Sequence, residues 1–163
     1  MDMFCFQCQE TAGGKGCTKR GVCGKEAEVA NVQDLLIYMC KGISVYSTKA
    51  RESGIKNQRV NKFIVDSLFM TITNANFDKR DFVKKIKEGF KLREEISEQV
   101  LSDGVKMPKK LPDCATWKAQ KESDFVSKAE SADVGVLVTE NEDKRSLREL
   151  LIYGIKGMAA YSE

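Results

Sequence analysis

The sequence contains no histidine among its 163 residues. This absence excludes Ser/His and Cys/His catalytic arrangements and imidazole-based metal sites built from this chain alone. Proline is scarce, because only Pro108 and Pro112 occur. The chain also lacks a large excess of charge of one sign, because it contains 27 Lys and Arg residues and 24 Asp and Glu residues. The resulting net charge of +3 does not indicate a protein that binds nucleic acid.

Long hydrophobic runs are absent as well. No stretch approaches the roughly 18 consecutive apolar residues of a membrane span. The first ten residues, MDMFCFQCQE, lack the basic and apolar regions of a secretory signal. We therefore expect no membrane association and a cytoplasmic location. Hydrophobic residues make up 42% of the chain, which is enough for a sizeable core.

From Lys25 onward, apolar residues recur at three- and four-residue spacing, which predicts an all-α fold. The expected division is a Cys/Gly-rich loop at 1–25, a three-helix bundle at 26–104, a linker at 105–113 and a second helical unit at 114–163. The helices expected in the bundle cover residues 26–51, 57–73 and 77–100. The elements expected later are short helices at 115–120 and 124–129, a brief strand at 134–139 and a helix at 143–163.

An internal repeat supports a second helical unit. Residues 34–47 read DLLIYMCKGISVYS and residues 149–162 read ELLIYGIKGMAAYS, with identity at eight of fourteen positions. The pairs Tyr38/Tyr153, Lys41/Lys156, Gly42/Gly157 and Tyr46/Tyr161 go beyond a shared hydrophobic pattern. The repeat predicts two similar three-helix bundles. Glycine inside a helix costs roughly 1 kcal/mol relative to alanine, so Gly42 and Gly157 indicate close helix packing. Asp34 and Glu149, which open the two copies, are expected on the helix surface.

Four of the six cysteines lie in the first 23 residues, as Cys5, Cys8, Cys17 and Cys23. Four thiolates are the number needed to hold one [4Fe-4S] cluster or one tetrahedral metal ion, and neither requires histidine. Five of the twelve glycines lie in the first 24 residues. Glycine lets the backbone turn sharply and brings amide groups close to cluster sulfurs.

Zinc and disulfides remain alternatives for this cysteine segment. Zinc ribbons usually pair two short knuckles, whereas Cys17 and Cys23 are separated by five residues, so the spacing favours iron and sulfur over zinc. Disulfides fit less well, because the chain has no secretory signal. Cys40 and Cys114 lie far from the other four and are interpreted as packing residues.

Charged and aromatic residues surround the four cysteines. The basic side chains would offset the negative charge of a thiolate-bound cluster, or they would simply form a solvated loop. The aromatic side chains would shield a cluster from water, or they would anchor the segment in the core. These residues are Lys15, Lys19, Arg20 and Lys25, and Phe4 and Phe6.

Two blocks of the sequence resemble a known family. Residues 3–25, MFCFQCQETAGGKGCTKRGVCGK, and residues 137–163, LVTENEDKRSLRELLIYGIKGMAAYSE, are similar to the N-terminal part of hybrid cluster proteins. These are also called prismane proteins and are associated with hydroxylamine reductase. The resemblance implies two three-helix bundles and a proximal [4Fe-4S] cluster on Cys5, Cys8, Cys17 and Cys23. Some relatives with different cysteine spacing carry a [2Fe-2S] centre instead.

The resemblance does not imply that this chain is catalytic on its own. Family members continue into α/β domains whose His, Glu and Cys side chains hold the hybrid cluster, and this chain has no histidine. We expect a [4Fe-4S] electron-transfer domain that is not catalytic alone and that exchanges electrons with an unidentified redox protein. The alternative is a structural or self-assembling module in which a cluster or zinc ion ties down the N-terminal loop. A homo-oligomer is expected, because residues that contact further domains would be left uncovered.

Overall fold

The fold was analysed in a computed structural model that describes residues 3–8, 11–119 and 121–162. These residues form six α-helices and two short 3-10 turns and contain no strand, which confirms the predicted all-α class. The helices are α1 (Ala27–Glu52), α2 (Gln58–Ile72), α3 (Lys79–Ser102), α4 (Asp113–Thr116), α5 (Glu122–Ala129) and α6 (Glu142–Ala160). The 3-10 turns are η1 (Ala12–Gly14) and η2 (Val136–Val138). No helix in this described part combines the length and hydropathy needed to cross a membrane.

The helix boundaries follow from local side-chain chemistry. The carboxamide or carboxylate oxygens of Asn57, Asp78 and Asn141 accept hydrogen bonds from backbone amides in the first turns of α2, α3 and α6. These caps satisfy amides that have no partner inside the helix. Gly54 and Gly104 follow the ends of α1 and α3 with positive φ angles of 81° and 69°, which an L side chain rarely adopts.

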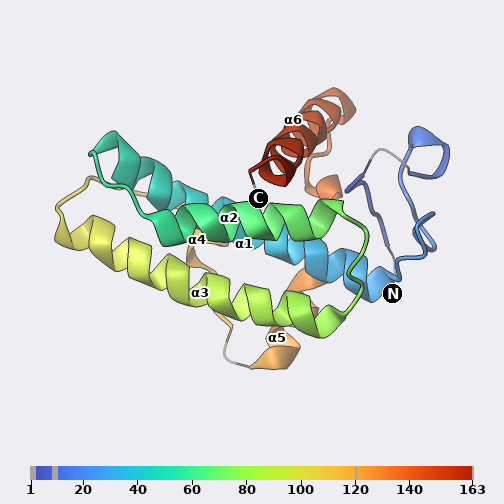
Figure 1. The fold of residues 1–163 in the computed structure, drawn as a ribbon, viewed down its shortest axis with the longest axis horizontal. Helices are drawn as coiled ribbons and strands as arrows, with labels where there is room; N and C mark the ends of the chain where they lie inside the picture. The colour runs from blue at the N-terminus through green and yellow to red at the C-terminus, as the bar shows by residue number, and fades with distance from the viewer. Residues whose placement is uncertain (1–2, 9–10, 120, 163) are drawn as a thin grey trace.

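The helix α1 is the centre of the molecule. Figure 1 shows α1, α2 and α3 side by side as an elongated layer, and α1 shares its most extensive interface with α3. The side chains between these three helices are almost completely removed from water, and this burial supplies the main stabilising free energy. They include Leu35, Leu36, Met39 and Ile43 of α1, Val60 and Phe63 of α2, and Phe82, Ile86 and Ile96 of α3.

The helices after residue 112 pack on this first bundle. Both α4 and α5 contact α1, whereas α6 contacts α2 and lies above the layer in Figure 1. The strand predicted at 134–139 is wrong, because Val136–Val138 forms a 3-10 turn. The Val138 and Thr139 amides donate to the Gly135 and Val136 carbonyls, so the turn satisfies locally the groups that a strand would offer to a neighbour. The proposed division at residues 25, 104 and 113 stays a prediction.

The two glycines matched by the repeat have different environments. A Cβ atom added at Gly42 would lie 1.9 Å from the carbonyl oxygen of Cys114. The backbone of α4 therefore rests directly on α1, and the close packing predicted at Gly42 is confirmed. A Cβ atom added at Gly157 meets nothing within 4 Å, so the structure does not show the close packing predicted there.

Alanine substitutions at these glycines should have opposite effects. Gly42→Ala should lower the free energy of unfolding by about 1–3 kcal/mol, because backbone atoms must move to admit the methyl group. Gly157→Ala is the matched control and should raise it by about 1 kcal/mol through helix propensity. Urea unfolding followed by circular dichroism measures both changes. Equal effects of the two substitutions would contradict the observed packing.

Candidate functional site

The N-terminal segment brings two of the four predicted cysteine ligands together. Cys5 and Cys17 form an antiparallel bridge in which each backbone amide donates to the other residue's carbonyl at 2.9 Å. Both residues are buried and pack with Met3 and Ala30 in a small apolar cluster. This bridge fixes the backbone of the first cysteine pair to that of the second.

The remaining two candidate ligands are more accessible. Cys8 is half-buried, and Cys23 is exposed in a turn whose Gly24 amide donates to the Gly21 carbonyl. Among the described residues, no group of three or more Cys, Asp or Glu side chains lies in an arrangement that could hold a metal ion. The assignment of all four cysteines as ligands therefore stays a prediction.

A glycine and an aromatic ring shape the loop beside Cys17. Gly16 has a φ angle of 121°, and a Cβ atom there would lie 2.8 Å from two ring carbons of Phe4. Only glycine fits under this ring without a shift of the loop. The half-buried Phe4 thus packs against the chain immediately before Cys17, next to the candidate ligand.

The other two cysteines belong to the helical core. Cys40 lies in the main core cluster around α1, and Cys114 packs against that cluster. Burial raises the pKa of the Cys40 thiol to about 12. Their positions agree with the packing role expected from the sequence.

A buried hydrogen-bond network lies directly behind the Cys5–Cys8 motif. Its centre is Gln7, between the two cysteines, with only 3% of its surface exposed. The Nζ atom of Lys25 donates to Oε1 of Gln7 at 3.2 Å and to Oε1 of Gln33 at 2.5 Å. The Lys25 side chain is 1% exposed, unlike the exposed Lys15, Lys19 and Arg20. Of the four basic residues singled out in the sequence, Lys25 is therefore the one buried beside the cysteine motif.

The same glutamine connects the segment to α1 and α6. Its Nε2 atom donates to Oδ1 of Asp34 at 2.6 Å and to the carbonyl of Ala30 at 3.1 Å. Its backbone carbonyl accepts a hydrogen bond from Nζ of Lys156 at 3.2 Å. Lys156 is 1% exposed and lies 149 positions from Gln7 in the sequence. Segments that are far apart in the sequence therefore meet at this motif.

Burial controls the ionisation of these groups. It raises the pKa of the Asp34 carboxyl to about 6, although the Gln7 hydrogen bond and Lys156 oppose the rise. It lowers the pKa of Lys156 to about 8, against the attraction of Asp34. It also raises the pKa of the Cys5 thiol to about 11, against the attraction of Lys25. Two buried lysines and the buried Asp34 carboxylate thus lie beside the thiols, and the half-buried Glu149 carboxylate also attracts Lys156.

The sequence alone did not identify all of this site. Asp34 was expected on the helix surface, and this expectation is wrong because its carboxylate is buried under Gln7. Gln7 and Lys156 were not singled out as site residues. Gln7 could have been found from its place inside the Cys-x-x-Cys motif. The identity of Lys41 and Lys156 within the repeat drew attention to Lys156, but it did not show that Lys156 is buried.

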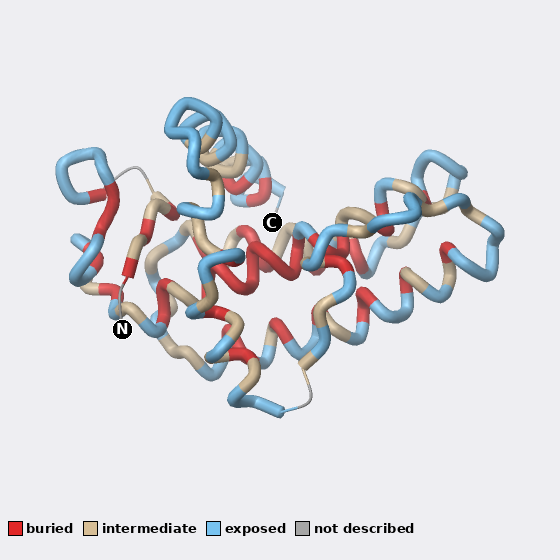
Figure 2. The backbone as a smooth tube through the Cα atoms, turned by 180° about the vertical axis from the view of Figure 1, so that it is seen from behind, coloured by how far each residue is buried: buried red, intermediate tan, exposed pale blue. Residues whose placement is uncertain are grey.

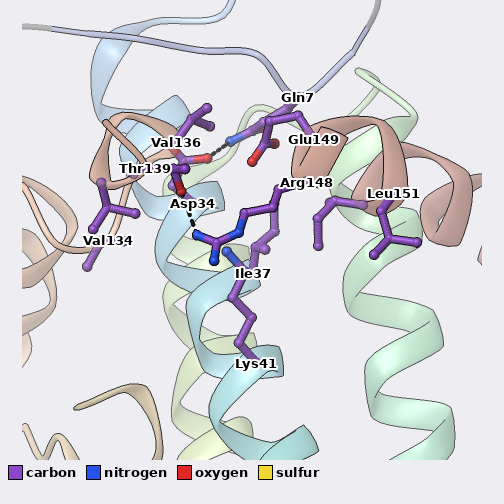
Figure 3. A pocket seen from close by; sticks show the side chains of 13 residues that line it. Gln7, Asp34, Ile37, Lys41, Val134, Val136, Thr139, Arg148, Glu149 and Leu151 are labelled. Atoms are coloured by element: carbon purple, nitrogen blue, oxygen red, sulfur yellow. Dashed lines mark hydrogen bonds between the residues drawn. The ribbon is translucent and has the colours of Figure 1, made fainter. Parts of the chain in front are cut away.

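A cavity of about 330 Å³ opens beside this network, between α1, α6 and residues 134–139. Gln7 and Asp34 line its inner end, where Figure 3 shows them joined by a hydrogen bond. Arg148 extends into the same space and donates from Nη1 to Oγ1 of Thr139 at 2.8 Å. The cavity therefore borders the buried hydrogen bond between Gln7 and Asp34.

Residues 3–163 match the Prismane/CO dehydrogenase family. A hydroxylamine reductase from Clostridium novyi (strain NT) is 60% identical over 162 residues, which are 99% of this chain and 29% of the relative. A hydroxylamine reductase from Desulfitobacterium hafniense (strain DSM 10664 / DCB-2) is 58% identical over 163 residues, which are 100% of this chain and 29% of the relative. The chain therefore spans less than a third of the length of these curated relatives.

Proposed function

We propose, since this chain belongs to the Prismane/CO dehydrogenase family, that its N-terminal segment holds an iron–sulfur cluster and passes single electrons. The prismane family binds iron–sulfur clusters. The finer proposal is one [4Fe-4S] cluster on Cys5, Cys8, Cys17 and Cys23. When bound, this group supplies reversible one-electron chemistry. The hydroxylamine reductase activity named for the longer relatives is not proposed for this part alone.

The observation that carries the proposal is the pair of buried lysines behind the Cys5–Cys8 motif. Burying an ammonium group is costly unless an opposite charge compensates it. Asp34 is the one buried carboxylate hydrogen-bonded within the network of Gln7, Lys25 and Lys156. A cluster held by four thiolates carries negative charge, so it would add to the compensation that Asp34 and the half-buried Glu149 provide. The donor set therefore fits an anionic iron–sulfur group.

Each surrounding residue then has a definable task. Lys25 and Lys156 hold positive charge next to the thiolates and favour the reduced, more negative state of the site. Gln7 fixes the loop between Cys5 and Cys8 to α1 and α6 through three hydrogen bonds. The ring of Phe4 limits the approach of water beside Gly16.

Anaerobic purification followed by iron and acid-labile sulfide analysis tests the proposal. We expect equal amounts of iron and sulfide, about four of each per chain, as one cubane requires. A potentiometric titration should then show one reversible one-electron step. A protein that contains zinc, or no metal, would contradict the proposal.

A second candidate is a structural module in which a cluster or zinc ion only ties down the N-terminal segment. The hydrogen bonds from Gln7 to α1 and from Lys156 to Gln7 favour it, because they already join this segment to distant helices. A bound metal that shows no reversible reduction would select this candidate. The homo-oligomer expected from the sequence is likewise a proposal, which light scattering at several protein concentrations measures.

A further inference from the structure

The net positive charge of the chain is concentrated in one loop. Residues 11–25, TAGGKGCTKRGVCGK, contain four basic residues and no acidic residue. The whole chain has 27 Lys and Arg residues, so 23 of them lie outside this loop, against 24 Asp and Glu residues. The excess of positive charge therefore depends on the segment that carries Cys17 and Cys23.

Three stretches of this loop are open to solvent. Residues 12–15, 18–20 and 22–23 are exposed, and buried residues at 16–17 and 21 separate them. Figure 2 shows this alternation in the N-terminal segment, at one end of the molecule. Lys19 and Arg20 lie in the second stretch, and Val22 and Cys23 form the third. Val22 is 66% exposed, so an apolar side chain and a candidate ligand follow directly after two cations.

Hydrogen bonds fix the turn that carries Cys23. The Gly21 amide donates to the Lys25 carbonyl at 2.8 Å, and the Gly24 amide donates to the Gly21 carbonyl at 2.8 Å. A Cβ atom added at Gly21 would lie 3.1 Å from Sγ of Cys23, so this sulfur is folded back over the turn. The buried Lys25 side chain anchors the end of the loop through its hydrogen bonds. Because the backbone is already fixed, binding a partner here costs little conformational entropy.

Arg20 already binds a carboxylate at the edge of this loop. Its Nη2 atom lies 3.0 Å from Oε1 of Glu26, and its Nε atom donates to the Gly24 carbonyl at 3.3 Å. Both side chains of the ion pair are 65% exposed, and ion pairs this exposed contribute little to stability. A carboxylate of another protein can therefore replace Glu26 on Arg20 at little cost.

We propose that this loop docks an acidic one-electron carrier protein, which delivers its electron at Cys23. The docking surface consists of Lys19, Arg20, Val22 and Cys23. The inference rests on the proposed function, because it requires an iron–sulfur cluster on the four cysteines. Of these four, Cys23 is exposed and Cys8 is half-buried, whereas Cys5 and Cys17 are buried. Electron transfer slows steeply with distance, so a carrier must approach the accessible side of the site.

The transfer itself forms and breaks no bond. One electron leaves the reduced carrier, which is oxidised, and the same electron reduces the iron–sulfur site. The cations of the docking surface attract carboxylates on the carrier and speed the encounter, while Val22 supplies an apolar contact between them. Interfaces between electron-transfer proteins are small, which suits a surface of four residues.

Other occupants match this docking surface less well. A second copy of the chain would bring the same basic loop, and like charges repel. A nucleic acid would contact the same cations, but the rest of the chain has no excess of positive charge to extend the contact along a phosphate backbone. A carrier protein needs contact only around the exposed ligand, which is where Lys19 and Arg20 lie.

Stopped-flow reduction of the cluster-loaded protein by reduced plant-type ferredoxin, an acidic one-electron carrier, tests the proposal. At low ionic strength the Lys19→Glu/Arg20→Glu variant should react at least about tenfold more slowly than the wild-type protein, because attraction becomes repulsion. The neutral variant Lys19→Gln/Arg20→Gln should react at an intermediate rate. Added salt should slow the wild-type reaction and reduce these differences, since ions screen exposed charges.

The matched control is the Lys109→Glu/Lys110→Glu variant. It reverses two exposed charges in the segment after α3, at the opposite end of the layer from the N-terminal segment in Figure 1. This variant should react with ferredoxin at the wild-type rate, and all variants should keep the wild-type iron content. An equal loss of rate in the control would overturn the proposal, because net charge alone would then explain the effect.

A small reductant separates this proposal from the proposed function. Reduced methyl viologen, a small cation, should reduce the Lys19→Glu/Arg20→Glu variant no more slowly than the wild-type protein, because it needs no docking surface. Equal rates of these two proteins with ferredoxin, together with normal reduction by viologen, would overturn the docking proposal and leave the proposed function intact. A protein that neither reductant reduces would overturn both. If the ferredoxin rates were equal and the variant instead lost self-association or binding to a DNA oligonucleotide, a second copy or a nucleic acid would be the occupant and the proposal would be wrong.

Discussion

The Cys17→Ser variant is expected to lose its iron–sulfur cluster, with less than about one tenth of the wild-type iron and sulfide retained after anaerobic purification. A cubane held by the protein alone requires four thiolates, and a serine hydroxyl is a harder and weaker ligand than a thiolate for these irons. The backbone bridge between Cys5 and Cys17 uses only amides and carbonyls, so serine preserves it. Loss of the cluster would therefore be caused by the missing sulfur ligand and not by disruption of this backbone bridge.

The matched controls are Cys114→Ala and Cys40→Ala, which should both retain the cluster. Cys114 is half-buried in α4, and Cys40 lies in the core around α1. Circular dichroism should show the same helix content in all three variants. Full iron content in Cys17→Ser, or loss of iron in Cys114→Ala, would contradict the ligand assignment.

Local sequence patterns were sufficient to predict the long helices. The expected helix at 26–51 corresponds to α1 at Ala27–Glu52, and the one at 57–73 corresponds to α2 at Gln58–Ile72. Periodic apolar residues, capping side chains and glycine stops all act within a few residues of one another, so the sequence displays them directly. The strand predicted at 134–139 is wrong. A strand needs a neighbouring strand to pair with, and the local sequence does not show whether one is present.

The candidate site could be predicted only in part. The spacing of the cysteines identified the N-terminal segment, but it did not show that Lys25 and Lys156 are buried behind it. Lys41 and Lys156 are identical in type and occupy the same repeat position, yet one is exposed and the other is buried. Distant segments decide which face of an amphipathic helix is covered. Lys156 of α6, for example, contacts Gln7, which lies 149 positions away in the sequence.

The buried charges lead to a prediction about the reduction potential of the proposed cluster. Lys156→Met should lower this potential, because it removes a positive charge that favours the more negative reduced state. Asp34→Asn should raise it, because it removes a negative charge while an amide can still accept from Gln7. Each shift should be on the order of tens of millivolts, since charges close to a buried site interact through a low effective dielectric constant. Anaerobic potentiometric titration of the purified variants measures both shifts.

Opposite signs distinguish an electrostatic role from a structural one. If Lys156 and Asp34 only held the loop in place, both substitutions would loosen it and move the potential in the same direction, or reduce the iron content. Lys144→Met is the matched control, because it removes a lysine charge from the exposed first turn of α6 and leaves the hydrogen bonds around Gln7 intact. Its potential should equal that of the wild-type protein. Shifts of the same sign in Lys156→Met and Asp34→Asn, with full cluster content, would show that the buried charges do not set the potential.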